Sequence, residues 1–163
     1  ARIVLGNGGL PTGEASVGPG FQAWLERATK MQQVGDMPVG RIVGGAHGPE
    51  VVAAYETPFP TPAYKAGPLA MPLLVPITPD DPAAAANRAA WEVYRQWEKP
   101  FITAFSDGDP ITKGGDVMFQ KLIPGAQGQK HTIIEGGGHF LQEDRGEAFA
   151  EVVIQFIADN PLP

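Results

Sequence analysis

The chain has 163 residues, a net charge of −6 and 43% hydrophobic residues, which suits one globular domain and excludes a disordered chain. No run of lysine and arginine occurs, which argues against nucleic acid and anionic membrane surfaces as partners. No run of about 18 apolar residues occurs either, so we expect no membrane-spanning helix. Without cysteine, disulfides, a thiol nucleophile and thiolate metal sites are excluded, and we expect a cytoplasmic location.

The first residues already have the pattern of a strand. Residues 2–5 form an apolar run, and no initiator methionine stands ahead of them. Proteins seldom begin inside what looks like a buried strand, so we interpret the chain as a piece of a longer polypeptide. A processed mature terminus is the alternative interpretation.

A long segment with helical patterns follows this strand. The predicted helices cover residues 21–32, 38–43, 49–55 and 82–98. Asp81 followed by Pro82 is typical of an N-cap and a first helical position, and predicts the start of the last helix. Because no strand pattern interrupts these helices, we predict a helical insertion of about ninety residues between two strands.

The C-terminal third alternates strands and helices. Residues 101–105 and 131–135 are continuous apolar runs, as expected for strands covered on both faces of a parallel sheet. Between them, residues 116–122 form a predicted helix with Asp116 as its N-cap. Apolar residues then recur at helical spacing from about residue 142 to residue 159.

This order of elements predicts an α/β fold. We expect residues 1–9 to form a core strand and the start of the connection, residues 10–99 a helical cap, and residues 100–163 the C-terminal part of the core. In such folds, ligands bind at the carboxyl ends of the parallel strands. Candidate functional residues are therefore sought where the strands end.

Two reactive side chains follow the last two predicted strands. Asp109 comes shortly after residues 101–105, and His139 follows the three glycines at 136–138. Successive glycines let the backbone turn sharply, which leaves the imidazole at the rim of the sheet. Adjacent parallel strands can then bring the carboxylate onto one ring nitrogen and leave the other as a base. A turn aspartate and a surface histidine are the alternative.

The remaining candidates are less specific. Asp107 competes with Asp109 for the carboxylate role, although Asp107 could instead hydrogen-bond the turn itself. His47 and His131 have no second ligand at metal-binding spacing, so we predict structural roles for both and no metal site. We also expect no organic cofactor.

Several stretches together resemble the C-terminal half of an α/β-hydrolase, and most closely a haloalkane dehalogenase. In chain order they are residues 7–13, 21–24, 96–101, 107–110 and 136–144. The resemblance implies the last three strands of a mostly parallel α/β-hydrolase sheet plus a helical cap insertion, with the N-terminal half absent from this chain. Because the run Gly108-Asp109-Pro110-Ile111 resembles the family's pattern, Asp109 is preferred over Asp107 as the catalytic carboxylate.

The run Phe21-Gln22-Ala23-Trp24 is the specific part of the resemblance. In dehalogenases with a similar cap, a tryptophan of the first cap helix donates its indole N–H to the halide. The resemblance therefore implies that Trp24 binds the halide and that Phe21, one helical turn earlier, lines the same pocket. The alternative for Trp24 is packing, which is also what we expect of Trp91 and Trp97.

The resemblance further implies hydrolysis of a haloalkane to an alcohol and a halide ion through an ester intermediate. No Gly-x-Ser-x-Gly or Gly-x-Asp-x-Gly elbow occurs, so the nucleophile is expected from a missing N-terminal half, as a second chain or segment. An epoxide hydrolase would need two cap tyrosines, for which Tyr55 and Tyr64 are candidates. The general motifs at Asp109 and His139 would also fit an esterase of the same fold or a catalytically inactive binding module.

Overall fold

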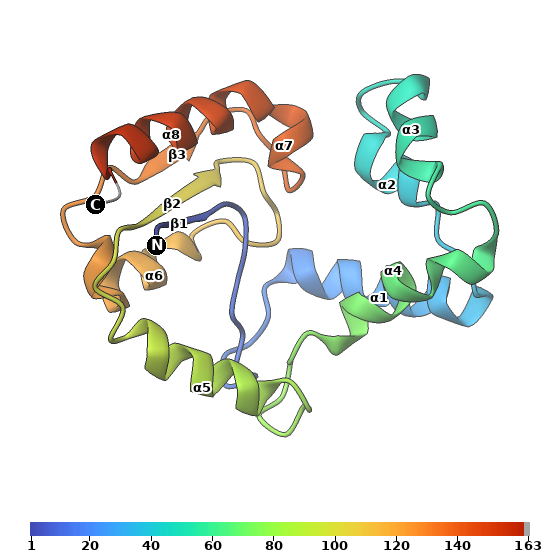
Figure 1. Ribbon diagram of the computed structural model, residues 1–163. Helices are drawn as coiled ribbons and strands as arrows, with labels where there is room; N and C mark the ends of the chain where they lie inside the picture. Colours follow the sequence, from blue (N-terminus) through green and yellow to red (C-terminus); the bar gives the residue numbers. More distant parts are fainter. Residues whose placement is uncertain (162–163) are drawn as a thin grey trace. The chain divides into compact units, whose positions relative to one another are not determined.

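The computed structural model describes residues 1–161 and contains the strands and helices drawn in Figure 1. They are, in chain order, β1 (Ile3–Leu5), α1 (Pro19–Val34), α2 (Val39–Gly44), α3 (Pro49–Glu56), η1 (Pro62–Lys65), α4 (Ala66–Ala70), η2 (Met71–Leu74), α5 (Ala84–Tyr94), β2 (Phe101–Ser106), α6 (Asp116–Leu122), η3 (Pro124–Ala126), β3 (Thr132–Ile134), α7 (Leu141–Asp144) and α8 (Gly146–Asp159). The elements marked η are single turns of 3₁₀ helix.

The chain packs into two compact units. Ala1–Leu10 together with Ala85–Pro163 form one unit, here called the core unit, and Pro11–Ala84 form the other, here called the helical unit. This grouping describes packing alone, and the expected cap of residues 10–99 stays a prediction. The last two residues of the expected core segment, 100–163, lie outside the described residues.

The core unit is built on a three-stranded parallel sheet in the order β1-β2-β3. Ile3 of β1 lies opposite Phe101 of β2, and Ala104 of β2 lies opposite Thr132 of β3. The central strand β2 is buried along its whole length, as its continuous apolar run predicts. All three predicted strands are confirmed, and with them the α/β class.

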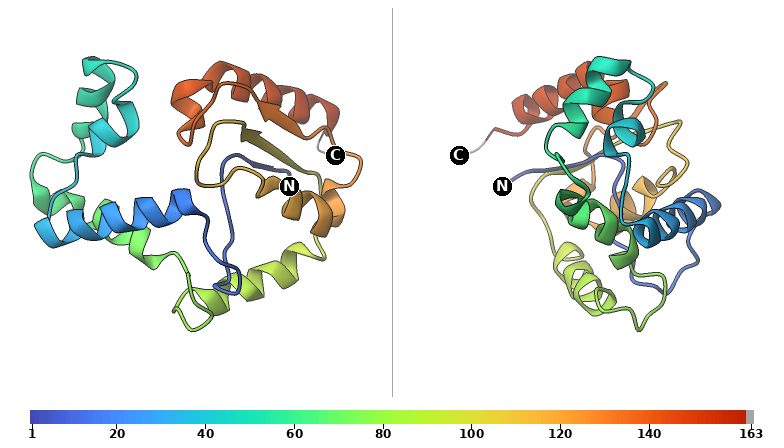
Figure 2. Two further views of the ribbon diagram at one scale, coloured as in Figure 1. Left: turned by 180° about the vertical axis from the view of Figure 1, so that it is seen from behind. Right: turned by 90° about the vertical axis from the view of Figure 1, so that its right-hand side faces the viewer.

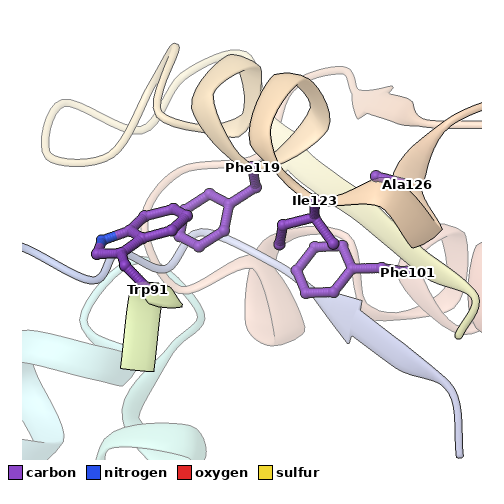
Figure 3. Packing of buried hydrophobic residues seen from close by; sticks show 5 residues of the cluster. All are labelled: Trp91, Phe101, Phe119, Ile123 and Ala126. Carbon is purple, nitrogen blue, oxygen red and sulfur yellow. The ribbon is translucent and has the colours of Figure 1, made fainter. Parts of the chain in front are cut away.

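Helices cover both faces of this sheet. On one face, Phe101 packs with Trp91 of α5 and with Phe119 of α6 in the cluster of Figure 3, and the Phe101 and Phe119 rings lie 6.1 Å apart. On the other face, Ala104 packs with Ile134 and Leu141, beneath α7 and α8. Figures 1 and 2 show α6 and α8 on opposite sides of the strands. Alternate residues of β2 therefore supply both layers of the core.

Two expected helix caps are wrong. The N-cap of α6 is Gly115, and Asp116 is the first helical residue, whose buried carboxylate accepts a hydrogen bond from Gln120 at 3.0 Å. Helix α5 begins at Ala84 instead of Pro82, and Asp81 accepts the backbone N–H groups of the preceding residues 77 and 78. Each carboxylate therefore accepts hydrogen bonds from groups other than the backbone N–H groups of the first helical turn, which an N-cap would bind.

Other helices differ from their predicted bounds. The expected helix from residue 142 to residue 159 is two helices, because Arg145 leaves the helical region at φ −144° between α7 and α8. The guanidinium of Arg145 donates to the carbonyls of Glu135 and Asp144 at that point. Residues 62–74, for which no helix is predicted, form the short helices η1, α4 and η2.

The helical unit has a small interior with a buried cation. Lys65 is 6% exposed, and its ammonium pairs with Asp36 at 2.9 Å and with Glu56. Helices α2 and α3 pack closely, since a Cβ on Gly40 would lie 2.2 Å from the carbonyl oxygen of Val52. Among residues 1–161, no helix has the length and apolar character needed to cross a membrane.

Candidate active site

Asp109 is a buried, ionised carboxylate just after β2. It is 1% exposed, and it accepts the backbone N–H of Ile111 at 2.8 Å and the hydroxyl of Thr112. Burial raises the pKa of Asp109, but the hydrogen bonds from Thr112, Ile111 and His139 lower it more, so the pKa lies below the ordinary value. The group is therefore charged at neutral pH.

The imidazole of His139 faces this carboxylate. Its Nδ1 lies 3.0 Å from Oδ2 and 3.1 Å from Oδ1 of Asp109. Because an ionised carboxylate can only accept, Nδ1 carries a proton, so Nε2 is the nitrogen that holds the lone pair when the ring carries a single proton. The side chain of His139 is 34% exposed, so water can reach the ring. The structure thus brings the two expected catalytic residues together.

Asp107 has a different role. Its Oδ1 accepts the N–H of Gly136 at 2.8 Å, and its own N–H donates to the carbonyl of Ile134 at 3.2 Å. Asp107 therefore holds the loop that precedes His139, whereas Asp109 contacts the imidazole itself. The sequence suggests that Asp107 could hydrogen-bond its own turn. In the structure its carboxylate instead accepts from the loop after β3.

The glycines beside the site are required by close contacts. Gly136 has φ +73°, and a Cβ there would lie 2.5 Å from the guanidinium of Arg145. The N–H of Gly108 donates to the carbonyl of Gly137 at 3.0 Å, and a Cβ on Gly108 would lie 2.6 Å from that oxygen. The loops after β2 and β3 can therefore lie this close only with glycine at position 108, while the positive φ at position 136 favours glycine there.

Three polar residues to which the sequence pattern assigns no role surround the histidine. Asn7, after β1 and at φ +40°, donates Nδ2 to the carbonyls of Gly138 at 2.7 Å and His139 at 3.1 Å. Ser106 Oγ donates to the carbonyl of Gly138 at 2.8 Å, and Asp144 accepts the N–H of Gly138 at 2.6 Å. An asparagine after a strand, a residue type that tolerates positive φ, was the signal for the first.

The candidate ligand-binding residues of the cap lie in the helical unit. Phe21 and Trp24 are both half-buried in α1, three residues apart and hence on one face of that helix. Tyr55 of α3 is half-buried, whereas Tyr64 of η1 is 63% exposed. Halide binding by Trp24 and pocket lining by Phe21 stay predictions.

The other histidines have no metal partners in the part of the chain that the structure describes, where no group of three His, Cys, Asp or Glu could hold an ion. Nδ1 of His131 accepts the N–H of Thr103 at 3.0 Å, and Nε2 lies 2.9 Å from the carbonyl of Ala126. Because a backbone N–H only donates and a carbonyl only accepts, the ring is neutral and both its nitrogens are used. His131 therefore ties β3 to β2 and η3, and His47 is exposed on the loop after α2.

The expected packing roles of the other two tryptophans are confirmed. Trp91 is 5% exposed within the aromatic cluster, and its Nε1 donates to the carbonyl of Leu10 at 2.9 Å. Trp97 packs against the same cluster, with Lys99 over its ring at 5.6 Å. Both belong to the core unit.

No protein-family model matches the chain. Among proteins of known function, it is 50% identical to a haloalkane dehalogenase of Psychrobacter cryohalolentis over 99% of this chain and 54% of that protein. It is 44% identical to a haloalkane dehalogenase of Mycobacterium marinum over 96% of this chain and 52% of that protein. The chain thus spans about half the length of these relatives, and the half is their C-terminal portion.

Solved structures agree on the fold. The tetrameric haloalkane dehalogenase DpaA from Paraglaciecola agarilytica NO2 matches 99% of this chain, and 53% of its own, with a TM-score of 0.82 at 23% identity. DatA from Agrobacterium tumefaciens C58 matches 97% of this chain and 55% of its own with a TM-score of 0.67 at 19% identity. The chain is therefore homologous, over nearly its whole length, to the C-terminal portion of haloalkane dehalogenases and has that part of their α/β-hydrolase fold.

Proposed function

We propose that this chain is the C-terminal part of an enzyme that hydrolyses haloalkanes to an alcohol and a halide ion. The observation that carries the proposal is the contact between the buried carboxylate of Asp109 and Nδ1 of His139, in a chain 50% identical to a haloalkane dehalogenase. That contact provides an oriented base at the carboxyl ends of parallel strands, where an α/β fold binds its substrate.

The reaction has two steps. In the first, a carboxylate oxygen outside this chain attacks the carbon that bears the halogen, forming a C–O ester bond while the C–X electron pair leaves as halide. In the second, Nε2 of His139 takes a proton from water, the hydroxide attacks the ester carbonyl, and the alcohol leaves with the carboxylate restored. The net reaction consumes one water and releases one alcohol, one halide and one proton.

Asp109 supports His139 in the second step. When Nε2 takes the proton, the imidazole becomes a cation, and the ionised carboxylate against Nδ1 stabilises that charge. Because three hydrogen bonds keep the pKa of Asp109 low, the carboxylate does not take the proton itself. The proton therefore stays on the imidazole, and Asp109 acts by stabilising the cation.

Trp24 serves as a halide donor in this proposal. A departing halide needs an N–H donor in an apolar, water-poor surrounding, and an indole supplies one donor on a large apolar body. Trp24 and Phe21 share one face of α1 and are half-buried, so part of each side chain remains accessible to a ligand. Phe21 then lines the apolar part of the same pocket.

The nucleophile and a second halide-binding residue come from an N-terminal segment that partners this chain. The relatives are about twice as long, and within residues 1–161 the strand β1 pairs with β2 on one side only. A parallel strand of the partner segment would cover the other edge of β1.

Because that edge of β1 has no partner within residues 1–161, we expect the 163 residues alone, without the N-terminal segment, to aggregate. A cooperative thermal transition of the chain alone would contradict this part of the proposal. We place the assembled enzyme in the cytoplasm, as the lack of cysteine favours.

The test uses the chain assembled with its N-terminal segment. Wild-type protein should release halide from bromoalkanes over many turnovers, whereas His139→Ala should release about one halide per active site and then stop with the ester trapped. The trapped ester appears in the intact mass as one added alkyl group. His47→Gln is the matched control and should turn over normally.

The same assay separates the competing functions. An epoxide hydrolase or an esterase would turn over epoxides or carboxylic esters and release no halide. A catalytically inactive binding module would turn over none of the three substrate classes. Continued turnover of the haloalkane by His139→Ala would show that the histidine is not the base.

A further inference from the structure

We propose that Asn7 is a positioning residue for the base His139, acting through the backbone on both sides of the histidine, with Ser106 as a second donor. This inference rests on the proposed function and adds residues to its machinery. Asn7 touches no reacting atom in the two-step reaction. It acts by fixing where Nε2 of His139 lies.

The orientation of the Asn7 amide follows from its partners. Its Oδ1 accepts the backbone N–H of Ser106 at 2.8 Å, and a backbone N–H can only donate. Its Nδ2 lies 2.7 Å from the carbonyl of Gly138 and 3.1 Å from that of His139, and both carbonyls can only accept. The flipped amide would set an oxygen against two oxygens, so only the observed orientation satisfies all three bonds.

These bonds fix the backbone of His139 completely. The carbonyl of Gly138 belongs to the peptide plane before the Cα of His139, and the carbonyl of His139 belongs to the plane after it. With both planes held by one amide group, φ and ψ of His139 cannot rotate without breaking a hydrogen bond. Only the side-chain torsions remain, and the contact between Nδ1 and Asp109 sets those.

The hydrogen bonds made by Asn7 and Ser106 join the carboxyl ends of all three strands. Asn7 follows β1, Ser106 ends β2, and the carbonyls that they hold follow β3. Ser106 is 1% exposed, and its Oγ donates to the carbonyl of Gly138 at 2.8 Å, so that oxygen accepts two hydrogen bonds. A partly buried carbonyl with both lone pairs used is costly to move, because moving it breaks two hydrogen bonds at once, and this holds the histidine loop in place.

The decisive variant is Asn7→Asp, which keeps the size of the side chain and changes one donor into an acceptor. At neutral pH the new carboxylate would repel the carbonyls of Gly138 and His139 while still accepting from Ser106. Asn160→Asp is the matched control, because it adds the same charge at the amino ends of the strands. The Asn160 amide also donates to a backbone carbonyl, that of Phe156, at 3.1 Å.

Two further variants complete the set. Asn7→Gly removes the side chain and suits the positive φ at this position, so it adds no backbone strain. Ser106→Ala removes one donor to the carbonyl of Gly138 and keeps the backbone N–H that Asn7 accepts. If both Asn7 variants fail to fold, Ser106→Ala tests the proposal instead.

The assembled enzyme is assayed in single and multiple turnover with a bromoalkane. Both Asn7 variants should keep the first halide burst and slow the subsequent ester hydrolysis about tenfold to a hundredfold, because a misplaced base affects only the second step. Ser106→Ala should slow that step several-fold, and Asn160→Asp should change neither step. A purely structural role would lower the burst and the hydrolysis together, and that result, or unchanged hydrolysis in the variants that fold, would overturn the proposal.

A second readout does not depend on turnover. The proton shared between Nδ1 of His139 and Asp109 gives a low-field proton NMR resonance, which should shift or vanish in the Asn7 variants and persist in Asn160→Asp. If the wild-type protein releases no halide, the proposed function fails while this resonance still tests the positioning. An unchanged resonance in Asn7→Asp and Asn7→Gly would overturn the inference even in an active enzyme.

Discussion

The core unit and the helical unit are held together by different kinds of contact. The core unit buries many large apolar side chains: Trp91, Phe101, Ile102, Phe105, Phe119, Ile123, Ile134, Leu141 and Phe156. The helical unit buries few, namely Ala28, Met37, Leu69 and Ala84, and leaves Val34, Met71 and Leu74 largely exposed. Apolar burial therefore stabilises the core unit far more.

Their polar contacts differ in the same way. In the core unit, hydrogen bonds gather at the strand ends and converge on one loop, where the carbonyl of Gly138 and the N–H of Gly138 are both bonded. In the helical unit, the buried polar contact is an ion cluster, in which Lys65 joins Asp36, just after α1, to Glu56 at the end of α3. Glu56 also accepts the N–H of Gly40 at 2.7 Å.

The difference matches two different demands on the proposed enzyme. A proton transfer needs atoms held at fixed positions, and the dense hydrogen bonds around His139 supply that. Binding an apolar haloalkane needs apolar surface that a closed core has not used, and the helical unit keeps such side chains half-buried, Phe21 and Trp24 among them. Variants in each unit should therefore affect different measurements.

The largest effect is expected from Asp109→Asn. The amide keeps the shape but can hold the imidazole in the wrong tautomer, and it no longer stabilises the imidazolium, so ester hydrolysis should fall on the order of 10³- to 10⁴-fold. Halide burst experiments measure this step separately from the displacement. Asp107→Asn, which changes the bond to Gly136, should cost less than about tenfold. A larger loss at Asp107 would reverse the assignment of the two carboxylates.

The next largest effect concerns the stability of the core unit. Phe101 is 2% exposed between the rings of α5 and α6, so Phe101→Ala should lower the free energy of unfolding by about 3–5 kcal/mol. Urea denaturation of the assembled protein measures this change. Val93→Ala on the exposed side of α5, where Val93 is 62% exposed, should cost no more than about 0.5 kcal/mol. Equal losses would mean that the aromatic cluster does not stabilise the unit.

Whether a feature could be predicted from the sequence depends on whether local pattern or long-range contacts determine it. Strands β2 and β3 follow from continuous apolar runs, and the contact of Asp109 with His139 follows from the convergence of parallel strand ends. These features depend on local pattern and on topology. The cap expected at Asp116 failed because Gln120, one turn later, offers that carboxylate a different partner. The rules that predict helix caps from residue type do not include such a competing side-chain donor.

The contacts that could not be predicted join residues far apart in the chain. Asn7 and Gly138 are 131 positions apart, and nothing in either local sequence specifies the pairing. Lys65 is an ordinary surface residue type, and its burial depends on the fold of η1 against α1 and α3. The short helices of residues 62–74 were missed because three prolines and a glycine interrupt any helical period there.

A smaller effect is expected from Trp24→Phe, which removes an indole donor with little change in apolar volume. Loss of one hydrogen bond to the halide should slow halide release about ten- to a hundredfold, or about 1.4–2.8 kcal/mol. Chloride or bromide should also quench the tryptophan fluorescence of the wild-type enzyme saturably. Trp91→Phe is the control, because its indole bonds the carbonyl of Leu10 and should affect stability while halide quenching persists. Unchanged dehalogenation in Trp24→Phe would return Trp24 to a packing role.

The smallest effect is expected from the ion cluster of the helical unit, and it should depend on pH. The hydrogen bond to Lys65 lowers the pKa of Asp36 and the pKa of Glu56, while Glu56 and Asp36 raise the pKa of Lys65. Carboxylates with lowered pKa values stabilise the fold above their ordinary range of about 4, and the stabilisation disappears as the pH falls through the folded values. A lysine with a raised pKa stabilises the fold at lower pH and loses this effect as the pH rises through its folded value.

The cluster should therefore contribute most between these limits. Lys65→Met removes the cation and leaves two carboxylates facing each other, so the melting temperature should fall at neutral pH, and the difference from wild type should shrink as the pH approaches 3. Lys130→Met is the matched control, since Lys130 pairs with Asp159 at 2.8 Å with 80% of its side chain exposed, where solvent screens the pair. The control should change the melting temperature less at every pH. A difference for Lys65→Met that stays constant from pH 7 to about pH 3 would show that the lysine stabilises the helical unit through packing of its methylene chain instead of its charge.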